Sequence, residues 1–290
     1  MKSPITYYGG KQLLAPVIIG LMPSHRIYCE PYFGGGAVFF AKGKSYLEVI
    51  NDHNKTLMTF YNVCQDEHLF ATLQALVQTT LHSESTYRKA YNIWLHPEGH
   101  LPVDVAWAVW LVTNMSYSAS PSGGWKWDNG TAGSHSAVVM DNYRKQFNDK
   151  LFERLRLVQI SCRDAIDVIS QRDSADTFFY LDPPYPGCEQ KHYSGFDFVA
   201  LEELLTLLGD IKGRFILSNF DSQVLRRAVK ANGWNTKVVD MAMRVSNFNE
   251  ARRKKEVLVY NYTIEPQLFP DDEDYSVCGG VTATKTTDAI

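Results

Sequence analysis

The sequence predicts a doubly wound α/β fold, with helices on both faces of a mostly parallel sheet. Short apolar or β-branched runs alternate with segments whose apolar residues recur every three to four positions. Two runs, 157–161 and 177–181, are bounded by turn residues and are expected to be strands buried on both faces. The alternation is interrupted over residues 83–145, which predicts a small, mainly helical insert.

The remaining expected elements follow the same alternation. Strands are expected at 27–30, 46–50, 214–218, 236–241 and 256–262, and helices at 37–41, 57–64, 69–77, 201–208 and 224–230. A polar, basic loop separates the last two strands, so we expect them to form an antiparallel hairpin at the edge of the sheet. Residues 1–82 and 146–264 then form the main domain, and the acidic, Thr- and Gly-containing residues 265–290 form a flexible tail.

The composition argues against several classes of protein. Of the 290 residues, 45% are hydrophobic and 21% are charged, which is typical of a folded globular protein. The longest apolar run, Val105 to Val112, is too short to cross a bilayer. Five cysteines without Cys-x-x-Cys spacing argue against a zinc site and favour reduced thiols in the cytoplasm. The net charge of −3 argues mildly against a nucleic-acid binder, although a balanced chain can carry a basic face.

Two features of the first 60 residues could bind a ligand. Phe33-Gly34-Gly35-Gly36 lies between an expected strand and an expected helix, where glycines permit a sharp turn and close approach of a ligand. The spacing matches neither Gly-x-Gly-x-x-Gly nor a P-loop. Asp52 ends the next strand, where an acid can bind both hydroxyls of a ribose. Asn51 or Asp52 could instead cap the following helix, and the sequence alone leaves both interpretations open.

The segment Asp182-Pro183-Pro184-Tyr185 is the most specific feature of the chain. It follows the expected buried strand 177–181 and so lies at the carboxyl edge of the sheet, where α/β proteins form their sites. The prolines stiffen the turn and remove backbone donors, which leaves carboxylate and carbonyl acceptors suited to an NH2 group. Tyr185 offers a ring for stacking a base. A Pro-rich ligand for a WW-type domain is disfavoured, because such a segment must be exposed.

Together with Phe33-Gly34-Gly35-Gly36 and Tyr8-Gly9-Gly10-Lys11, this segment resembles the DNA adenine methylase (Dam-type) family of S-adenosylmethionine-dependent DNA methyltransferases. The order of cofactor motif, recognition region and catalytic motif is the same, and the resemblance covers roughly residues 5–262. It implies a Rossmann-like catalytic domain, with residues 83–145 as the target-recognition insert.

The resemblance also implies a role for each matching residue. Asp182 and Tyr185, with the prolines between them, would hold the target adenine. Asp52 would bind the cofactor ribose, Lys11 would lie near the methionine carboxylate, and Asp164 near the cofactor adenine. The full implied cofactor site is Tyr7, Lys11, Phe33, Gly34, Gly35, Gly36, Asp52, Asp164 and Asp182, and the catalytic group is Asp182, Pro183, Pro184 and Tyr185.

The chemistry follows from the electronics of the adenine amine, whose lone pair is delocalised into the ring. Hydrogen bonds to Asp182 and to the Pro183 carbonyl would favour a localised lone pair and stabilise the positive charge that develops during methyl transfer. The mechanism needs no metal, histidine base or cysteine nucleophile. The base must leave the duplex stack to reach the pocket.

Two segments are expected to contact double-stranded DNA. The recognition loop around 114–136 would reach base edges or read DNA shape, and the basic segment near 244–255 would contact phosphates. The alternatives are a disordered surface loop and a solvated loop. The candidate DNA-binding residues are Ser116, Trp125, Lys126, Trp127, Arg252, Arg253 and Lys254.

Three other functions are weaker interpretations: a methyltransferase acting on RNA, a catalytically silent DNA-binding relative, and a Rossmann-type oxidoreductase. Well-known GATC-reading members carry Lys where this chain has Thr6, and their recognition hairpin differs, so we expect a target other than GATC. We expect a cytoplasmic, nucleoid-associated protein of bacterial or phage origin, as a monomer or weak dimer. Whether it belongs to a restriction-modification pair stays open.

Overall fold

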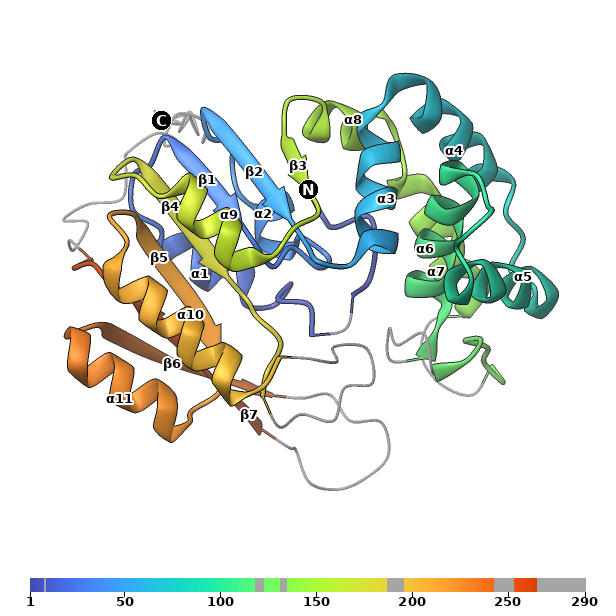
Figure 1. The fold of residues 1–290 in the computed structure, drawn as a ribbon. Helices are drawn as coiled ribbons and strands as arrows, with labels where there is room; N and C mark the ends of the chain where they lie inside the picture. Colours follow the sequence, from blue (N-terminus) through green and yellow to red (C-terminus); the bar gives the residue numbers. More distant parts are fainter. Residues whose placement is uncertain (8, 118–122, 131–134, 187–195, 243–252, 265–290) are drawn as a thin grey trace, which may run out of the picture.

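The computed structural model describes residues 1–264 except 8, 118–122, 131–134, 187–195 and 243–252, and at 241, 242, 253 and 254 it describes the backbone only. The described residues form a seven-stranded sheet in the order β3-β2-β1-β4-β5-β7-β6 (Figure 1). The strands are β1 (Ile27–Glu30), β2 (Leu47–Asn51), β3 (Gln159–Ser161), β4 (Thr177–Leu181), β5 (Arg214–Asn219), β6 (Asn235–Ala242) and β7 (Arg253–Tyr260). The predicted doubly wound, Rossmann-like fold is confirmed.

Strand direction separates the sheet into two parts. Strands β1 to β5 are mutually parallel, whereas β7 runs antiparallel to both β5 and β6. The predicted antiparallel hairpin at the sheet edge is therefore confirmed, and β7 inserts between β5 and the edge strand β6.

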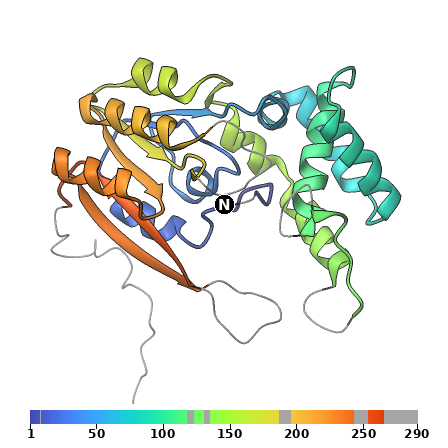
Figure 2. The ribbon, with the colours of Figure 1, turned by 60° about the horizontal axis from the view of Figure 1, so that its bottom comes forward.

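Helices cover both faces of the sheet. Figures 1 and 2 show α9, α10 and α11 on one face and α1 and α2 on the other, with α4 to α7 to one side of the sheet. The helices are α1 (Ala15–Leu21), α2 (Ala37–Ala41), α3 (Lys55–Gln65), α4 (Glu67–Thr79), α5 (Glu84–Leu95), α6 (Pro102–Met115), α7 (Ser136–Gln146), α8 (Asp149–Leu155), α9 (Ala165–Arg172), α10 (Phe198–Asp210) and α11 (Gln223–Asn232).

The side-chain alternation of the strands produces two hydrophobic cores. Phe179 and Leu181 of β4 pack with the core under α9 to α11, whereas Phe178 and Tyr180 join the core on the opposite face. Every residue of β4 is buried, as the sequence predicted for this central strand. Alternate residues serve both cores because successive side chains of a strand point to opposite faces.

The prediction of a fully buried strand at 157–161 is wrong. Strand β3 covers only Gln159–Ser161, Gln159 is exposed, and Leu157, which precedes the strand, is 77% exposed. The physical reason is position, since β3 is an edge strand that pairs with β2 alone. An apolar run does not reveal whether its strand will lie at the centre or at the edge of the sheet.

The insert is organised around α6. Every residue from Val105 to Met115 is buried, and α6 packs against α5 and also against α3 and α4, which precede the insert in the chain. The indole of Trp107 donates to Thr80 Oγ1 at 2.7 Å. Among the described residues, no helix is both long and apolar enough to cross a membrane.

Thr6 joins the N-terminal segment to the insert. Its backbone N–H and its hydroxyl donate to Asn114 Oδ1 of α6 at 2.9 and 3.0 Å, and its hydroxyl lies 2.9 Å from the Tyr143 hydroxyl of α7. The Asn114 amide in turn donates to the Pro4 carbonyl at 3.0 Å. The Thr6 side chain is thus engaged in contacts within the protein.

Candidate active site

The candidate site lies where the direction of chain winding reverses. After β1 the chain proceeds to β2 on one side, and after β4 it proceeds to β5 on the other. Such a reversal leaves a crevice beyond the carboxyl ends of the two strands, which is where open α/β sheets bind ligands. Residues 31–36 follow β1 and residues 182–185 follow β4, so the two motifs meet at this edge.

The turn after β1 requires its glycines. Gly34 and Gly36 have φ angles of +48° and +63°, which favour glycine. A Cβ at Gly36 would lie 2.4 Å from Phe33 Cζ, and one at Gly35 would lie 2.8 Å from Tyr7 Cβ. Tyr7 and buried Phe33 therefore pack directly on the backbone of the turn, which leaves no room for side chains there.

Asp52 is bound to this turn. Its Oδ2 accepts from the Gly34 N–H at 2.8 Å and its Oδ1 accepts from the Asn54 N–H at 2.9 Å. Burial raises the pKa of Asp52, although these backbone N–H groups act in the opposite direction. The alternative that Asn51 or Asp52 caps the following helix is wrong, because Asn54 caps α3 by accepting from the Leu57 N–H at 3.1 Å.

Asn51 was not selected from the sequence as a site residue, yet it connects three segments. Its amide donates to the carbonyls of Pro31 and Arg163, both at 3.0 Å, and its Oδ1 accepts from the Arg163 N–H at 2.9 Å and the Ser161 hydroxyl at 2.8 Å. Asp164, next along the chain, caps α9 through the Ile166 N–H at 2.8 Å and is exposed. Asn51 thus fixes the loop that carries Asp164 against the turn after β1.

Lys11 and Asp182 form an ion pair across the crevice. Lys11 Nζ lies 2.7 Å from Asp182 Oδ1 and 2.9 Å from Oδ2, and the same Nζ lies 3.4 Å from Glu256 Oε1. Burial acts to lower the pKa of the Lys11 ammonium, but the two carboxylates more than offset burial and raise it. Sequence reasoning placed Lys11 near the cofactor, and the structure places its ammonium on Asp182, the aspartate predicted to be catalytic.

Tyr185 turns its hydroxyl toward the same acids. It donates to Glu256 Oε1 and lies 3.4 Å from Asp182 Oδ1. Burial, with the charges of Asp182 and Glu256, raises the pKa of Tyr185 well above its usual value, so the hydroxyl stays protonated. Lys11 Nζ lies 5.0 Å from the centre of the Tyr185 ring, and the Phe220 ring lies 6.0 Å from it.

Glu256 is a candidate site residue that sequence reasoning missed. It is fully buried on β7, where it also accepts from the Ser218 hydroxyl of β5 at 2.7 Å. The sequence placed Glu256 only as the first residue of an expected strand, and an acid at the start of an apolar run is the one local signal it gives. Within the described part of the chain, no three His, Cys, Asp or Glu side chains gather as metal ligands would.

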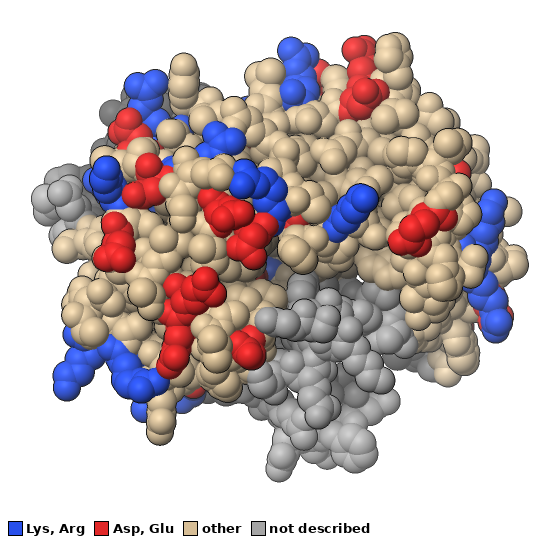
Figure 3. Space-filling model, viewed as in Figure 1, with Lys and Arg blue, Asp and Glu red and all other residues tan. Residues whose placement is uncertain are grey.

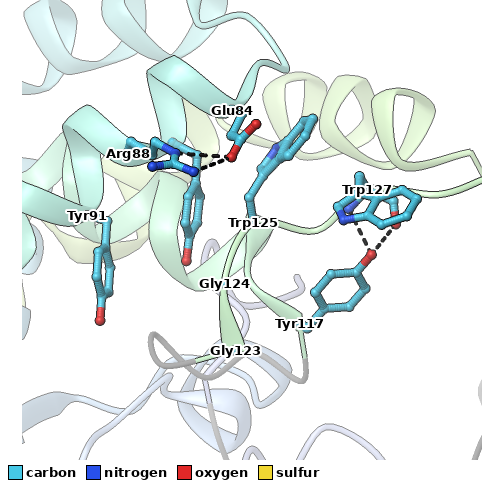
Figure 4. A pocket seen from close by; sticks show the side chains of 9 residues that line it. Glu84, Arg88, Tyr91, Tyr117, Gly123, Gly124, Trp125 and Trp127 are labelled. Atoms are coloured by element: carbon cyan, nitrogen blue, oxygen red, sulfur yellow. Dashed lines mark hydrogen bonds and ion pairs between the residues drawn. The ribbon is translucent and has the colours of Figure 1, made fainter.

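Residues of the expected recognition loop line a pocket in the insert. Trp125, Trp127 and Tyr117 line a pocket of about 690 Å³ together with Tyr91 of α5, and Trp127 lies beside Tyr117 (Figure 4). An isolated bridge joins Ser116 to Trp125, and the Tyr117 hydroxyl bonds to the backbone of Trp127. Ser116 is buried and its hydroxyl lies 2.8 Å from that of Tyr87, so it supports this pocket from inside.

The candidate phosphate-binding residues are only partly described. Arg244 and Arg252 lie outside the described residues, whereas the backbone of Arg253 and Lys254 begins β7, paired with Ala242 and Met241 of β6. Lys126 is half-buried, and its N–H donates to the Met115 carbonyl at 2.7 Å. Among the described residues on the face that carries α9 and α10, basic and acidic side chains are interspersed and form no continuous basic patch (Figure 3).

Comparison with known proteins identifies the family. Residues 7–243 match the D12 class N6 adenine-specific DNA methyltransferases. The chain is 23% identical to the Type II methyltransferase M.MjaIII of Methanocaldococcus jannaschii over 295 residues, covering 90% of this chain and 99% of that protein.

Two solved structures are similar over most of the chain. The precorrin 8W decarboxylase of Methanobacterium thermoautotrophicum shares 12% identity with a TM-score of 0.39, covering 91% of this chain and 96% of that one. The rRNA methyltransferase aviRa of Streptomyces viridochromogenes shares 10% identity with a TM-score of 0.36, covering 88% and 87%. The family match over most of the chain confirms the resemblance inferred from the motifs: the chain belongs to the D12 class of N6 adenine-specific DNA methyltransferases.

Proposed function

We propose that this DNA adenine methyltransferase transfers the methyl group of S-adenosylmethionine to N6 of an adenine that has been extruded from duplex DNA. The observation that carries the proposal is Asp182 at the winding reversal, 21% exposed and flanked by the buried side chain of Lys11 and by Tyr185. The carboxylate is thus both fixed within the protein and accessible to a ligand.

The residues after β4 suit an aromatic amine. Asp182 and the Pro183 carbonyl offer acceptors for the two N–H bonds of the amine, and Pro183 itself is buried, which holds the turn rigid. Acceptors fixed in advance stabilise the positive charge that develops on the nitrogen, without reorganising during the reaction. The Tyr185 ring supplies a face for the base, with its hydroxyl anchored on Glu256.

The residues after β1 and β2 fit the cofactor. Because added Cβ atoms would collide with Tyr7 and Phe33, the Gly34–Gly36 turn keeps bare backbone at the crevice, which suits close approach of a ligand. Asp52, fixed by two backbone N–H groups, would accept hydrogen bonds from the ribose hydroxyls. Bound there, S-adenosylmethionine supplies an electrophilic methyl group. Asp164 and Asn51 would border its adenine.

We further propose that DNA is read by the recognition loop and held by the basic segment. The exposed ring of Trp127, together with Trp125 and Lys126, would contact bases or sense DNA shape, and Arg252, Arg253 and Lys254 would bind phosphates. A Trp127→Ala variant should change which sequences are methylated. Arg253→Ala with Lys254→Ala should instead weaken all duplexes alike and flatten the salt dependence of binding by about one unit of slope per contact.

The proposal is tested with purified protein, methylation-free duplex DNA and S-adenosylmethionine carrying a deuterated methyl group. Mass spectrometry should detect deuterated N6-methyladenine, and sequencing should map it to sites other than GATC. Asp210→Asn, an exposed acid at the end of α10, serves as the control variant and should methylate as wild type does. Label in RNA adenine but none in duplex DNA, or wild-type methylation by Asp182→Asn, would contradict the proposal.

A further inference from the structure

The arrangement of Lys11 poses an electrostatic problem for the proposed chemistry. Its ammonium lies within 2.9 Å of both oxygens of Asp182. A positive charge in that position weakens the carboxylate as an acceptor and repels the positive charge that develops on the adenine nitrogen. Asp182 can act at full strength only if the ammonium moves away from it.

Glu256 provides a place for the ammonium. Its Oε1 lies 3.4 Å from Lys11 Nζ, so a small displacement converts this contact into a full hydrogen-bonded ion pair. The Lys11 side chain is only 6% exposed, and a buried ammonium that left Asp182 without reaching another acid would be an uncompensated buried charge. A second carboxylate within reach compensates that charge.

Glu256 is itself held in place. The Ser218 hydroxyl of β5 and the Tyr185 hydroxyl both donate to Oε1, and the antiparallel pairing of β7 with β5 fixes the backbone beside it. The acid therefore stays where it is while the flexible four-carbon stem of Lys11 moves.

We propose that Glu256 is a positioning residue that accepts the Lys11 ammonium when the adenine amine binds Asp182, and that it anchors Tyr185 throughout. The inference rests on the proposed role of Asp182 as acceptor of the amine. In the absence of substrate, Lys11 neutralises Asp182. When the amine arrives, Lys11 is transferred to Glu256, and the negative charge of Asp182 faces the reacting nitrogen.

The test compares duplexes that carry either adenine or purine, which lacks the 6-amine, at a mapped target site. Dissociation constants are measured with saturating S-adenosylhomocysteine, which cannot transfer a methyl group. Wild type should prefer adenine by about tenfold, as expected for roughly 1.4 kcal/mol of hydrogen bonding. Glu256→Gln keeps an acceptor for Tyr185 but holds an ammonium less strongly, so the preference should fall to within threefold.

The decisive variant adds Lys11→Met to Glu256→Gln. If the ammonium competes for Asp182, its removal should restore the preference for adenine and raise the single-turnover methylation rate above that of Glu256→Gln alone. If Glu256 only supports the fold, the double variant should be no better than the single one, which would overturn the proposal, as would an unchanged preference in Glu256→Gln.

Two controls separate the possible causes of failure. Glu48→Gln removes a comparably buried acid from another part of the sheet and should lower thermal stability while leaving the preference for adenine intact. Asp182→Asn should reduce the preference in the same assay. If Asp182→Asn keeps the wild-type preference, the proposed function of Asp182 is wrong, and this outcome is distinct from a failure confined to the Glu256 variants.

Discussion

At the amino ends of the strands, Lys42 and Arg154 share the carboxylate of Glu48, whereas at the carboxyl ends Asp182 and Glu256 share the ammonium of Lys11. We call these the amino-edge cluster (Lys42, Glu48, Arg154) and the carboxyl-edge cluster (Lys11, Asp182, Glu256). The two have opposite effects on their lysines. Burial lowers the pKa of Lys42 despite Glu48, whereas two acids raise the pKa of Lys11 despite its burial.

The amino-edge cluster is closed to ligands. Lys42 also donates to the Gly43 carbonyl at 2.8 Å, and Arg154 also donates to the Phe39 carbonyl at 2.9 Å and lies 3.5 Å from the centre of the Phe39 ring. Its three side chains are at most 8% exposed, compared with 21% for Asp182. A closed cluster can only contribute to stability, whereas a cluster with one accessible acid can act on a ligand.

The amino-edge cluster is expected to respond most strongly to the loss of its one acid. Glu48→Ala leaves two buried cations without their shared carboxylate, which should destabilise the protein by about 3–5 kcal/mol. Denaturant unfolding measures this loss, and the turnover of the remaining folded protein should be normal. A large fall in turnover without loss of stability would show that the amino-edge cluster takes part in catalysis.

The opposite result is expected at the accessible acid. Asp182→Ala removes an acceptor fixed in advance for the transition state, so methyl transfer should fall by about two to three orders of magnitude. Stability should change little, because the loss of Asp182 leaves Lys11 within reach of Glu256. Rapid-quench kinetics on duplex DNA with saturating cofactor provides the measurement, and near-normal turnover would remove Asp182 from the mechanism.

The two clusters also show which parts of the site can be predicted from the sequence. Asp182 was selected as a candidate because it belongs to a short, distinctive segment of the chain, and β4 was recognised as a central strand because its run is continuously apolar. Glu256 was missed because its partners Lys11 and Ser218 come from distant segments that only the strand order β4-β5-β7 brings together. The same dependence on strand order explains why β3 was wrongly expected to be buried.

A third acid at the carboxyl edge of the sheet, Asp52, is expected to act on the cofactor. If it binds the cofactor ribose, Asp52→Asn should weaken S-adenosylmethionine binding by about 1–3 kcal/mol through the loss of charged hydrogen bonds. The amide oxygen can still accept from the Gly34 N–H, so the turn itself should persist. Calorimetry on the free enzyme tests this without any methyl transfer, and an unchanged affinity would exclude Asp52 from the cofactor site.

The smallest expected effect concerns Glu30, whose carboxyl responds electrostatically to Asp182 of the carboxyl-edge cluster and to Lys42 of the amino-edge cluster. Burial raises the pKa of this carboxyl to about 8, with Asp182 adding to the shift and Lys42 opposing it, while the Tyr28 hydroxyl donates to it at 2.6 Å. The folded protein therefore keeps a proton that the unfolded chain releases near its ordinary pKa of 4.5.

The proton on Glu30 makes the folded protein less stable as the pH rises. The contribution of Glu30 to stability is fully present below pH 4.5 and is lost as the pH rises toward 8, at about 1.4 kcal/mol per pH unit within that window. Glu30→Gln keeps an acceptor for Tyr28 but has no proton to lose. Between pH 6 and 7 wild type should therefore lose about 1.4 kcal/mol more than the variant in urea unfolding. Parallel pH profiles for the two proteins would mean that Glu30 is already ionised in the fold, and that Lys42 compensates its charge.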